Sequence, residues 1–97
     1  MPATAVTVRA RPDLYVVRGA VQRAAAEAGV GGLVLDALLL ATAELASNLV
    51  RYAQGGRVTV EVIERDGRRG VEVRGDDDGP GIAELERALR DGVSTAG

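Results

Sequence analysis

Several residue types are missing from this 97-residue chain, which contains no cysteine, histidine, lysine, phenylalanine or tryptophan. Without cysteine and histidine, the chain has no disulfides, thiol nucleophiles, Ser-His catalytic triads or ordinary zinc sites. Without lysine, it has neither Schiff-base chemistry nor the Walker A lysine. Any catalysis must therefore use Asp, Glu, Asn, Arg or backbone groups, and any bound metal would be a hard, oxygen-liganded ion such as Mg²⁺.

Aromatic residues and excess positive charge are also scarce. The chain has two tyrosines and a formal net charge of −2, and it has no block of basic residues. These features argue against nucleic acid as a partner. The N-terminal "MPATAVTVRA" has no apolar signal core, and the uninterrupted apolar runs are shorter than the roughly 18 residues of a membrane span. We therefore expect one soluble cytoplasmic domain that has no contact with a membrane.

Hydrophobic periodicity predicts an alternation of strands and helices. Val6 and Val8 alternate with polar residues, as in a short strand, and "RVTVEVIER", "DGRRG" and "VEVRG" read as a β-hairpin. Three segments have helical spacing. They are Asp13 to Ala28, about Leu33 to Ala53, and "IAELERALRDG", which would end at Gly92.

The stretch "GDDDGPGI", from Gly75 to Ile82, combines three consecutive aspartates with two glycines around a proline. Adjacent carboxylates repel one another, and glycine permits unusual dihedrals or a close backbone approach that a Cβ would block. The stretch is compatible with a ligand-binding loop. It is equally compatible with a solvated acidic turn.

The second predicted helix carries its polar residues on one side. Glu44, Ser47, Asn48 and Arg51 lie at offsets 0, 3, 4 and 7, which at about 100° per residue places them in a single stripe. Because the rest of this helix is apolar, we expect it to be largely buried. The stripe is either a functional surface or the solvent face of a half-exposed helix, with Glu44 loosely paired with Arg51.

The order of these features resembles a known family. A helix with E-x-x-x-N ("ELASN"), a β-hairpin and then D-x-G-P-G ("DDGPGI") are arranged as in the GHKL ATPases, which have the Bergerat fold. The tail "ALRDGVSTAG" resembles the bacterial anti-sigma serine kinases, especially the switch kinases that act on STAS-domain antagonists. The resemblance extends from the first helix to Gly97 and implies an α/β two-layer sandwich. Histidine kinases share the loop, but they usually lack an acidic residue at the position of Glu44.

The resemblance assigns the adenine site to the acidic loop. Asp77 would accept a hydrogen bond from the adenine amino group. Gly79 and Gly81 would let the backbone turn beneath the purine, and Ile82 belongs to the same nucleotide-binding segment. Of the other two aspartates, Asp76 would be a surface residue at the strand end and Asp78 a loop residue.

The resemblance also assigns the triphosphate end of the site. Asn48 would coordinate Mg²⁺ through its carbonyl oxygen, with the triphosphate of ATP and water as the other ligands. Glu44 would orient or deprotonate the nucleophile, a serine hydroxyl in a kinase or a water in an ATPase. Ser94 and Thr95 would open the lid and touch the phosphates. Alternatively, they are tail residues at a chain end.

The chain departs from the family pattern at its C-terminal end. Family members continue past this point into a second glycine-rich box, a helix and a closing strand, whereas this sequence stops at Gly97. We therefore expect a single, C-terminally truncated ATP-binding domain with poor phosphoryl transfer. Uncovered apolar surface would favour self-association, for example as a homodimer.

Three functions agree with this interpretation. The first is an ATP-dependent serine/threonine protein kinase that phosphorylates a STAS-domain antagonist and controls an anti-sigma pathway such as a bacterial stress response. The second is a nucleotide-binding module that regulates a sigma factor, a STAS protein or a phosphatase by contact alone. The third is the ATP-binding part of a histidine kinase.

Overall fold

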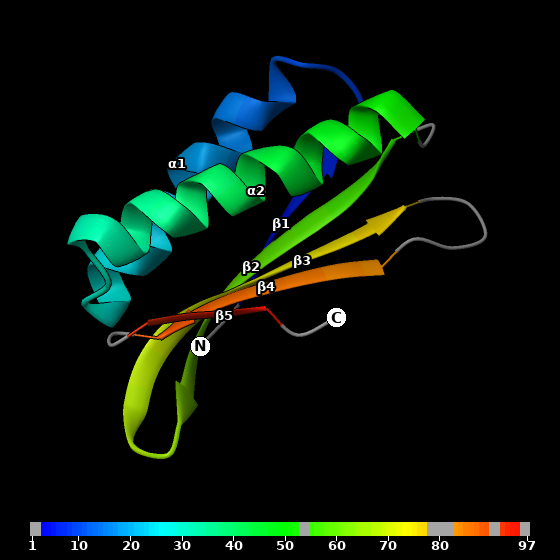
Figure 1. Cartoon of the computed structure of the whole chain (residues 1–97). Coiled ribbons are helices and arrows are strands. Elements are labelled where there is room, and N and C mark those ends of the chain that lie inside the picture. Colours follow the sequence, from blue (N-terminus) through cyan, green and yellow to red (C-terminus); the bar gives the residue numbers. More distant parts are fainter. Residues whose placement is uncertain (1–2, 53–54, 78–82, 90–91, 96–97) are drawn as a thin grey trace.

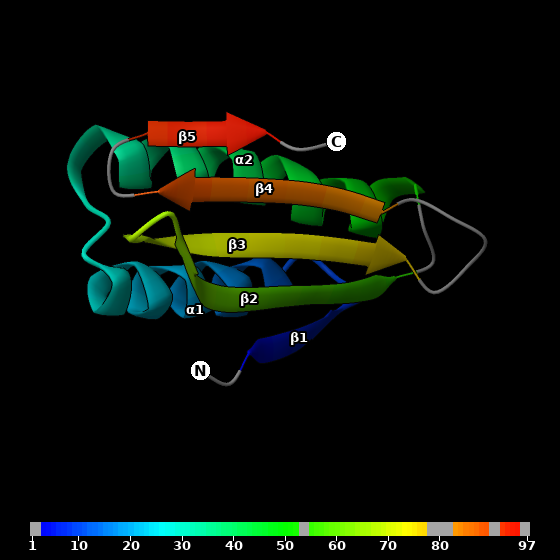
Figure 2. The same ribbon diagram turned by 90° about the horizontal axis from the view of Figure 1, so that it is seen from below.

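The computed structural model describes residues 3–52, 55–77, 83–89 and 92–95. These residues form two layers, a five-stranded antiparallel sheet in the order β1-β2-β3-β4-β5 and two helices packed on one of its faces (Figure 1). In Figure 2, α1 lies behind β2 and β3, whereas α2 lies behind β4 and β5. The elements are β1 (Thr4–Val8), α1 (Asp13–Ala28), α2 (Gly32–Tyr52), β2 (Gly56–Arg65), β3 (Arg68–Asp77), β4 (Ala83–Leu89) and β5 (Gly92–Thr95). The expected two-layer α/β sandwich is confirmed.

Helix α1 forms where its periodicity predicts it. Val17, Val21 and Ala25 recur at helical spacing and are buried against the sheet. Gly29 ends the helix in the left-handed conformation (φ 75°), and its amide donates to the carbonyl of Ala25. A residue with a Cβ would be strained at this φ, so the sequence itself determines where the helix ends.

Helix α2 is only partly buried, contrary to the expectation from its composition. Leu38, Leu45 and Leu49 are buried on its sheet-facing side, whereas the side chains of Leu33 and Leu40 are 85% and 67% exposed. By length and mean hydropathy, residues Gly32–Arg51 could cross a membrane, although Asp36 and Glu44 interrupt the apolar run, as expected from the sequence. Helices of globular domains can have the same length and composition, and here Leu38, Leu45 and Leu49 pack α2 on the sheet, although only 28% of the apolar window is buried.

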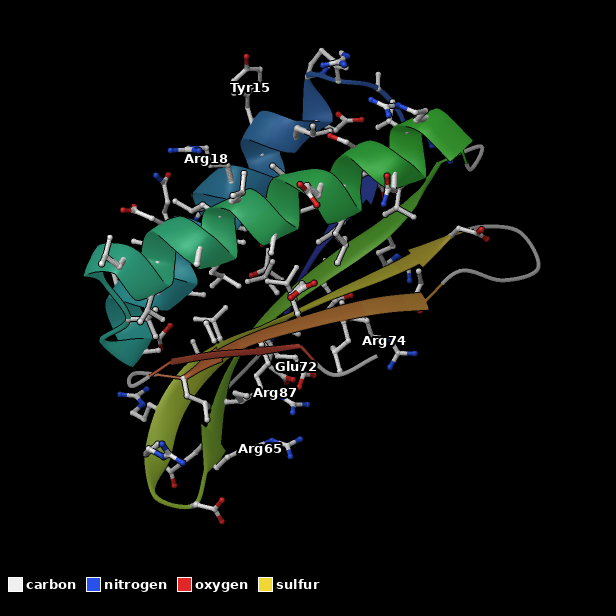
Figure 3. The ribbon with its side chains drawn as sticks, in the orientation of Figure 1. Tyr15, Arg18, Arg65, Glu72, Arg74 and Arg87 are labelled. Carbon is white, nitrogen blue, oxygen red and sulfur yellow. The ribbon has the colours of Figure 1, made fainter. Side chains whose placement is uncertain are left out.

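The segment expected as a third helix is strand β4, so that expectation is wrong. All of β4 pairs with β3, from Gly70 opposite Leu89 to Asp76 opposite Ala83. This pairing satisfies the backbone donors and acceptors along one edge of β3, which outweighs the helix propensity of "AELERAL". Arg87 of β4 also donates to Glu72 of β3 at 2.8 Å, and Figure 3 shows this pair on the sheet face opposite the helices.

Candidate functional site

The end of β3 directs alternate side chains toward opposite faces of the sheet. Val73 and Gly75 are buried beneath the helices. Because side chains alternate along a strand, Asp77 belongs to the same face, and it is half-buried. Asp76 belongs to the open face, where the Nε of Arg74 donates to its carboxylate at 3.1 Å. This alternation agrees with Asp77, and not Asp76, as the ligand-facing residue.

Helix α2 comes close to the end of β3 next to Gly56, the first residue of β2. Gly56 lies opposite Asp77 in the sheet register. A Cβ on Gly56 would lie 3.0 Å from the Cα of Asp77 and 3.1 Å from the Cδ2 of Leu49. Leu49 directly follows Asn48, so the Asn48 end of the α2 stripe lies at the same end of the sheet as Asp77.

The predicted stripe on α2 borders one open hollow of about 350 Å³. Its lining consists of Ala43, Glu44, Ser47, Asn48 and Arg51. Ser47 and Asn48 are half-buried and Glu44 is exposed. Within the described part of the chain Glu44 makes no hydrogen bond or ion pair, so the Glu44–Arg51 pair of the alternative interpretation does not form. The Glu44 carboxylate is therefore accessible from the hollow.

The hollow offers few ligands to a metal ion by itself. No group of three or more acidic side chains gathers to hold a metal among the residues described by the structure. Asn48 supplies an amide oxygen, and Glu44 supplies a carboxylate one turn earlier. These are donors of the kind that Mg²⁺ prefers, and an open hollow leaves room for the water and phosphate ligands that Mg²⁺ usually retains. The residues present therefore fit an ion that is held jointly with a nucleotide.

Other predicted site residues are not brought to this end of the sheet. Thr95 of β5 lies opposite Glu86, which in turn lies opposite Val73. Val73 precedes Asp77 by four residues, about 13 Å along a strand. Ser94 is one residue further from the Asp77 end of the sheet. The backbone of this expected lid segment lies in β5, which is an edge strand. Gly79, Gly81, Ile82 and Asp78 lie outside the described residues.

Sequence reasoning missed the two glycines at which α2 approaches the sheet. A Cβ on Gly75 would lie 2.6 Å from the Cδ2 of Leu45, and a Cβ on Gly56 would lie 3.1 Å from the Cδ2 of Leu49. Glycine inside a strand pattern often marks a close approach of another element. That signal was present in "QGGRVTV" and "EVRGDDD".

Comparison with known proteins identifies the family. The model of the histidine kinase-like ATPase domain matches residues 7–96. This chain belongs to that family, the GHKL ATPases. The GHKL domain described here is 32% identical over 85 residues to the serine/threonine-protein kinase RsbT of Bacillus subtilis (strain 168), a match that covers 88% of this chain. The chain spans 64% of the length of RsbT. Among solved structures, none matches this GHKL domain at a significant level.

Proposed function

We propose that this chain is the ATP-binding core of a regulatory serine/threonine protein kinase of the anti-sigma factor type, which works in the cytoplasm on a STAS-domain antagonist. The observation that carries the proposal is the meeting of α2 and β3 at Gly56, where one end of the sheet receives both Asp77 and the stripe of Glu44 and Asn48. The similarity to RsbT, whose name describes a serine/threonine-protein kinase, supports a serine or threonine hydroxyl as the acceptor.

Asp77 is proposed to recognise the adenine. Its half-buried carboxylate on the helix-facing side of β3 can accept a hydrogen bond from the adenine amino group. A hydrogen bond to a charged group contributes about 1.5–3 kcal/mol. Val73 and Gly75 precede Asp77 on the same face of β3 and are buried beneath the helices. By family resemblance, Gly79, Gly81 and Ile82 complete the adenine site.

Glu44 and Asn48 are proposed to act at the phosphate end of the nucleotide. The amide oxygen of Asn48 would hold Mg²⁺ together with the triphosphate. When bound, the ion would neutralise charge on the phosphates during phosphoryl transfer. The accessible carboxylate of Glu44 would orient the acceptor hydroxyl and take up its proton. By family resemblance, Ser94 and Thr95 contact the phosphates.

A nucleotide-binding titration with a matched charge control tests the adenine assignment. Asp77→Ala should weaken ATP binding by about tenfold or more, because the lost bond is worth about 1.5–3 kcal/mol. Asp76→Ala removes the same charge from the neighbouring residue on the other sheet face and should change the affinity far less. Isothermal titration calorimetry with Mg²⁺ present measures both affinities. An equal loss of ATP affinity in the two variants would mean that only the net charge matters, and it would contradict the proposal.

Transfer of labelled γ-phosphate to a STAS-domain protein tests the reaction itself. Incorporation on a serine or threonine supports the kinase. ATP binding without transfer, together with a stable complex with a sigma factor, a STAS protein or a phosphatase, would support regulation by contact alone.

A further inference from the structure

A second hollow lies between the two helices, on the side of the helix layer away from the sheet. It has a volume of about 280 Å³ and is lined by residues of α1 and α2, with Arg11 at the approach to α1. None of Glu44, Asn48 or Asp77 borders it. We call this hollow the interhelical groove. It shares only Ala43 with the hollow bordered by Glu44 and Asn48.

The walls of the interhelical groove are mainly apolar. Leu14 and Val17 come from α1, and Leu39, Ala43 and Ala46 come from α2. Tyr15, which is 79% exposed, stands at the opening and projects away from the sheet (Figure 3). Apolar walls with an aromatic ring at the mouth suit a flat or compact apolar body.

One buried polar group borders the groove and has no partner. The side chain of Thr42 lines the groove, and the residue is 2% exposed. Its Oγ1 makes no hydrogen bond in the described part of the chain. A buried hydroxyl without a partner destabilises the folded state. Because this atom has almost no accessible surface, an incoming hydroxyl or carbonyl oxygen would satisfy it after a rotation of the Thr42 side chain that turns Oγ1 into the groove.

The charge at the opening of the groove is positive. Arg11 and Arg18 both line it and are exposed, and no acidic residue does so. In the part of the chain that the structure describes, neither guanidinium takes part in a hydrogen bond or an ion pair. A guanidinium binds a carboxylate through two parallel N–H donors. The opening therefore selects an anion, while the interior selects an apolar body.

We propose that the interhelical groove binds a small monocarboxylate that has a compact apolar or aromatic body and a hydroxyl group at the end remote from the carboxylate. The carboxylate accepts hydrogen bonds from Arg11 or Arg18 at the opening, the body packs between Leu14 and Leu39, and the hydroxyl exchanges a hydrogen bond with Thr42.

Three probes of nearly equal size separate these interactions. They are 4-hydroxybenzoate, benzoate, which lacks the hydroxyl, and 4-hydroxybenzyl alcohol, which lacks the charge. Amide chemical shifts of the ¹⁵N-labelled chain report both affinity and location. We expect 4-hydroxybenzoate to shift signals of residues 11–18 and 39–46 and to saturate in the micromolar to millimolar range, as expected for about ten non-hydrogen atoms. The alcohol should bind about tenfold more weakly and benzoate about threefold more weakly.

Two variants test the assigned residues. Arg11→Gln with Arg18→Gln should weaken 4-hydroxybenzoate about tenfold, whereas the control Arg23→Gln with Arg57→Gln makes the same charge change at exposed positions outside the groove and should have little effect. Thr42→Val should remove the preference for 4-hydroxybenzoate over benzoate and leave the fold at least as stable, because it removes the unpaired hydroxyl at nearly constant volume.

Four results would overturn the proposal. They are an absence of saturation in the stated range, shifts that lie outside the two named segments, equal weakening by the control pair of arginine substitutions, and a hydroxyl preference that persists in Thr42→Val. Because the readout requires neither nucleotide nor phosphoryl transfer, the result is independent of the proposed kinase activity.

Discussion

Replacing Gly75 by alanine tests whether close packing of α2 on β3 holds the candidate site together. The added Cβ would lie 2.6 Å from the Cδ2 and 3.1 Å from the Cγ of Leu45, a side chain that is 2% exposed. Carbon atoms pack best at about 3.5–4.0 Å, so the methyl overlaps Leu45 by about 1 Å. The helix or the leucine must move, because the leucine is enclosed by the core.

The expected cost follows from two opposing terms. Overpacking of a core costs about 1–3 kcal/mol. Gly→Ala also restricts the unfolded chain, which stabilises the folded state by about 0.4–1 kcal/mol where the dihedrals allow it. We therefore expect Gly75→Ala to lower the free energy of unfolding by about 1–2 kcal/mol. Urea denaturation followed by circular dichroism measures this change.

Two further variants make the test specific. A Cβ at Gly31 meets no atom within 4 Å, so Gly31→Ala should be neutral or slightly stabilising. Leu45→Ala should cost about 2–5 kcal/mol alone, but in that background the methyl at Gly75 has room and its penalty should disappear. If Gly75→Ala is as stable as Gly31→Ala, or if its penalty persists without Leu45, the packing argument is refuted.

Three other variants test the remaining assignments. Asn48→Ala should abolish the Mg²⁺ dependence of ATP affinity, which titrations with and without Mg²⁺ would reveal, and an unchanged dependence would exclude Asn48 as the metal ligand. Glu44→Gln should leave ATP affinity nearly unchanged and suppress phosphoryl transfer to a STAS-domain protein. Glu27→Gln, on the exposed surface of α1, is the control. Normal transfer by the Glu44→Gln variant would exclude a catalytic role for Glu44. The amides of Arg9 and Ala10 donate to Asp13 at 2.8 and 3.0 Å and lower its pKa below the usual 3.8. The stabilisation from this carboxylate is fully present above its ordinary pKa of 3.8 and is lost as the pH falls through the lowered pKa. Asp13→Asn should therefore lose less stability than the unsubstituted chain between neutral pH and about pH 3. An equal loss in both proteins would contradict the assignment.

The sequence predicted those parts of the fold whose signals are local. Helix α1 was predicted at Asp13–Ala28, the residues that it spans, because its apolar spacing and the stop at Gly29 lie within one segment. The β2–β3 hairpin was predicted because its turn residues are adjacent, and both Asp66 and Gly67 have positive φ there. The prediction that Glu44, Ser47, Asn48 and Arg51 share one side of α2 also depended on helical spacing alone, and these residues do line one hollow.

The sequence failed where pairing over a distance decides the conformation. The residues of β4 have high helix propensity, but they pair with an otherwise open strand edge and bury Ala88. No local pattern encodes the availability of that edge. The interhelical groove was missed for the same reason, because Thr42 looks like an ordinary helical residue until α1 packs beside it and buries its hydroxyl.

The geometry of the candidate site depends on residues that bind nothing themselves. Asp77 and Asn48 are carried by different elements, and their relative position is set by how closely α2 approaches β2 and β3. At Gly56 and Gly75 a side chain would collide with Leu49 or Leu45, so glycine at these positions permits that approach. A displacement of about 1 Å is enough to weaken recognition by a preorganised site. Gly75→Ala should therefore reduce ATP affinity although the E-x-x-x-N and D-x-G-P-G residues are unchanged, and full affinity in a folded variant would show that Asp77 and Asn48 tolerate such a displacement.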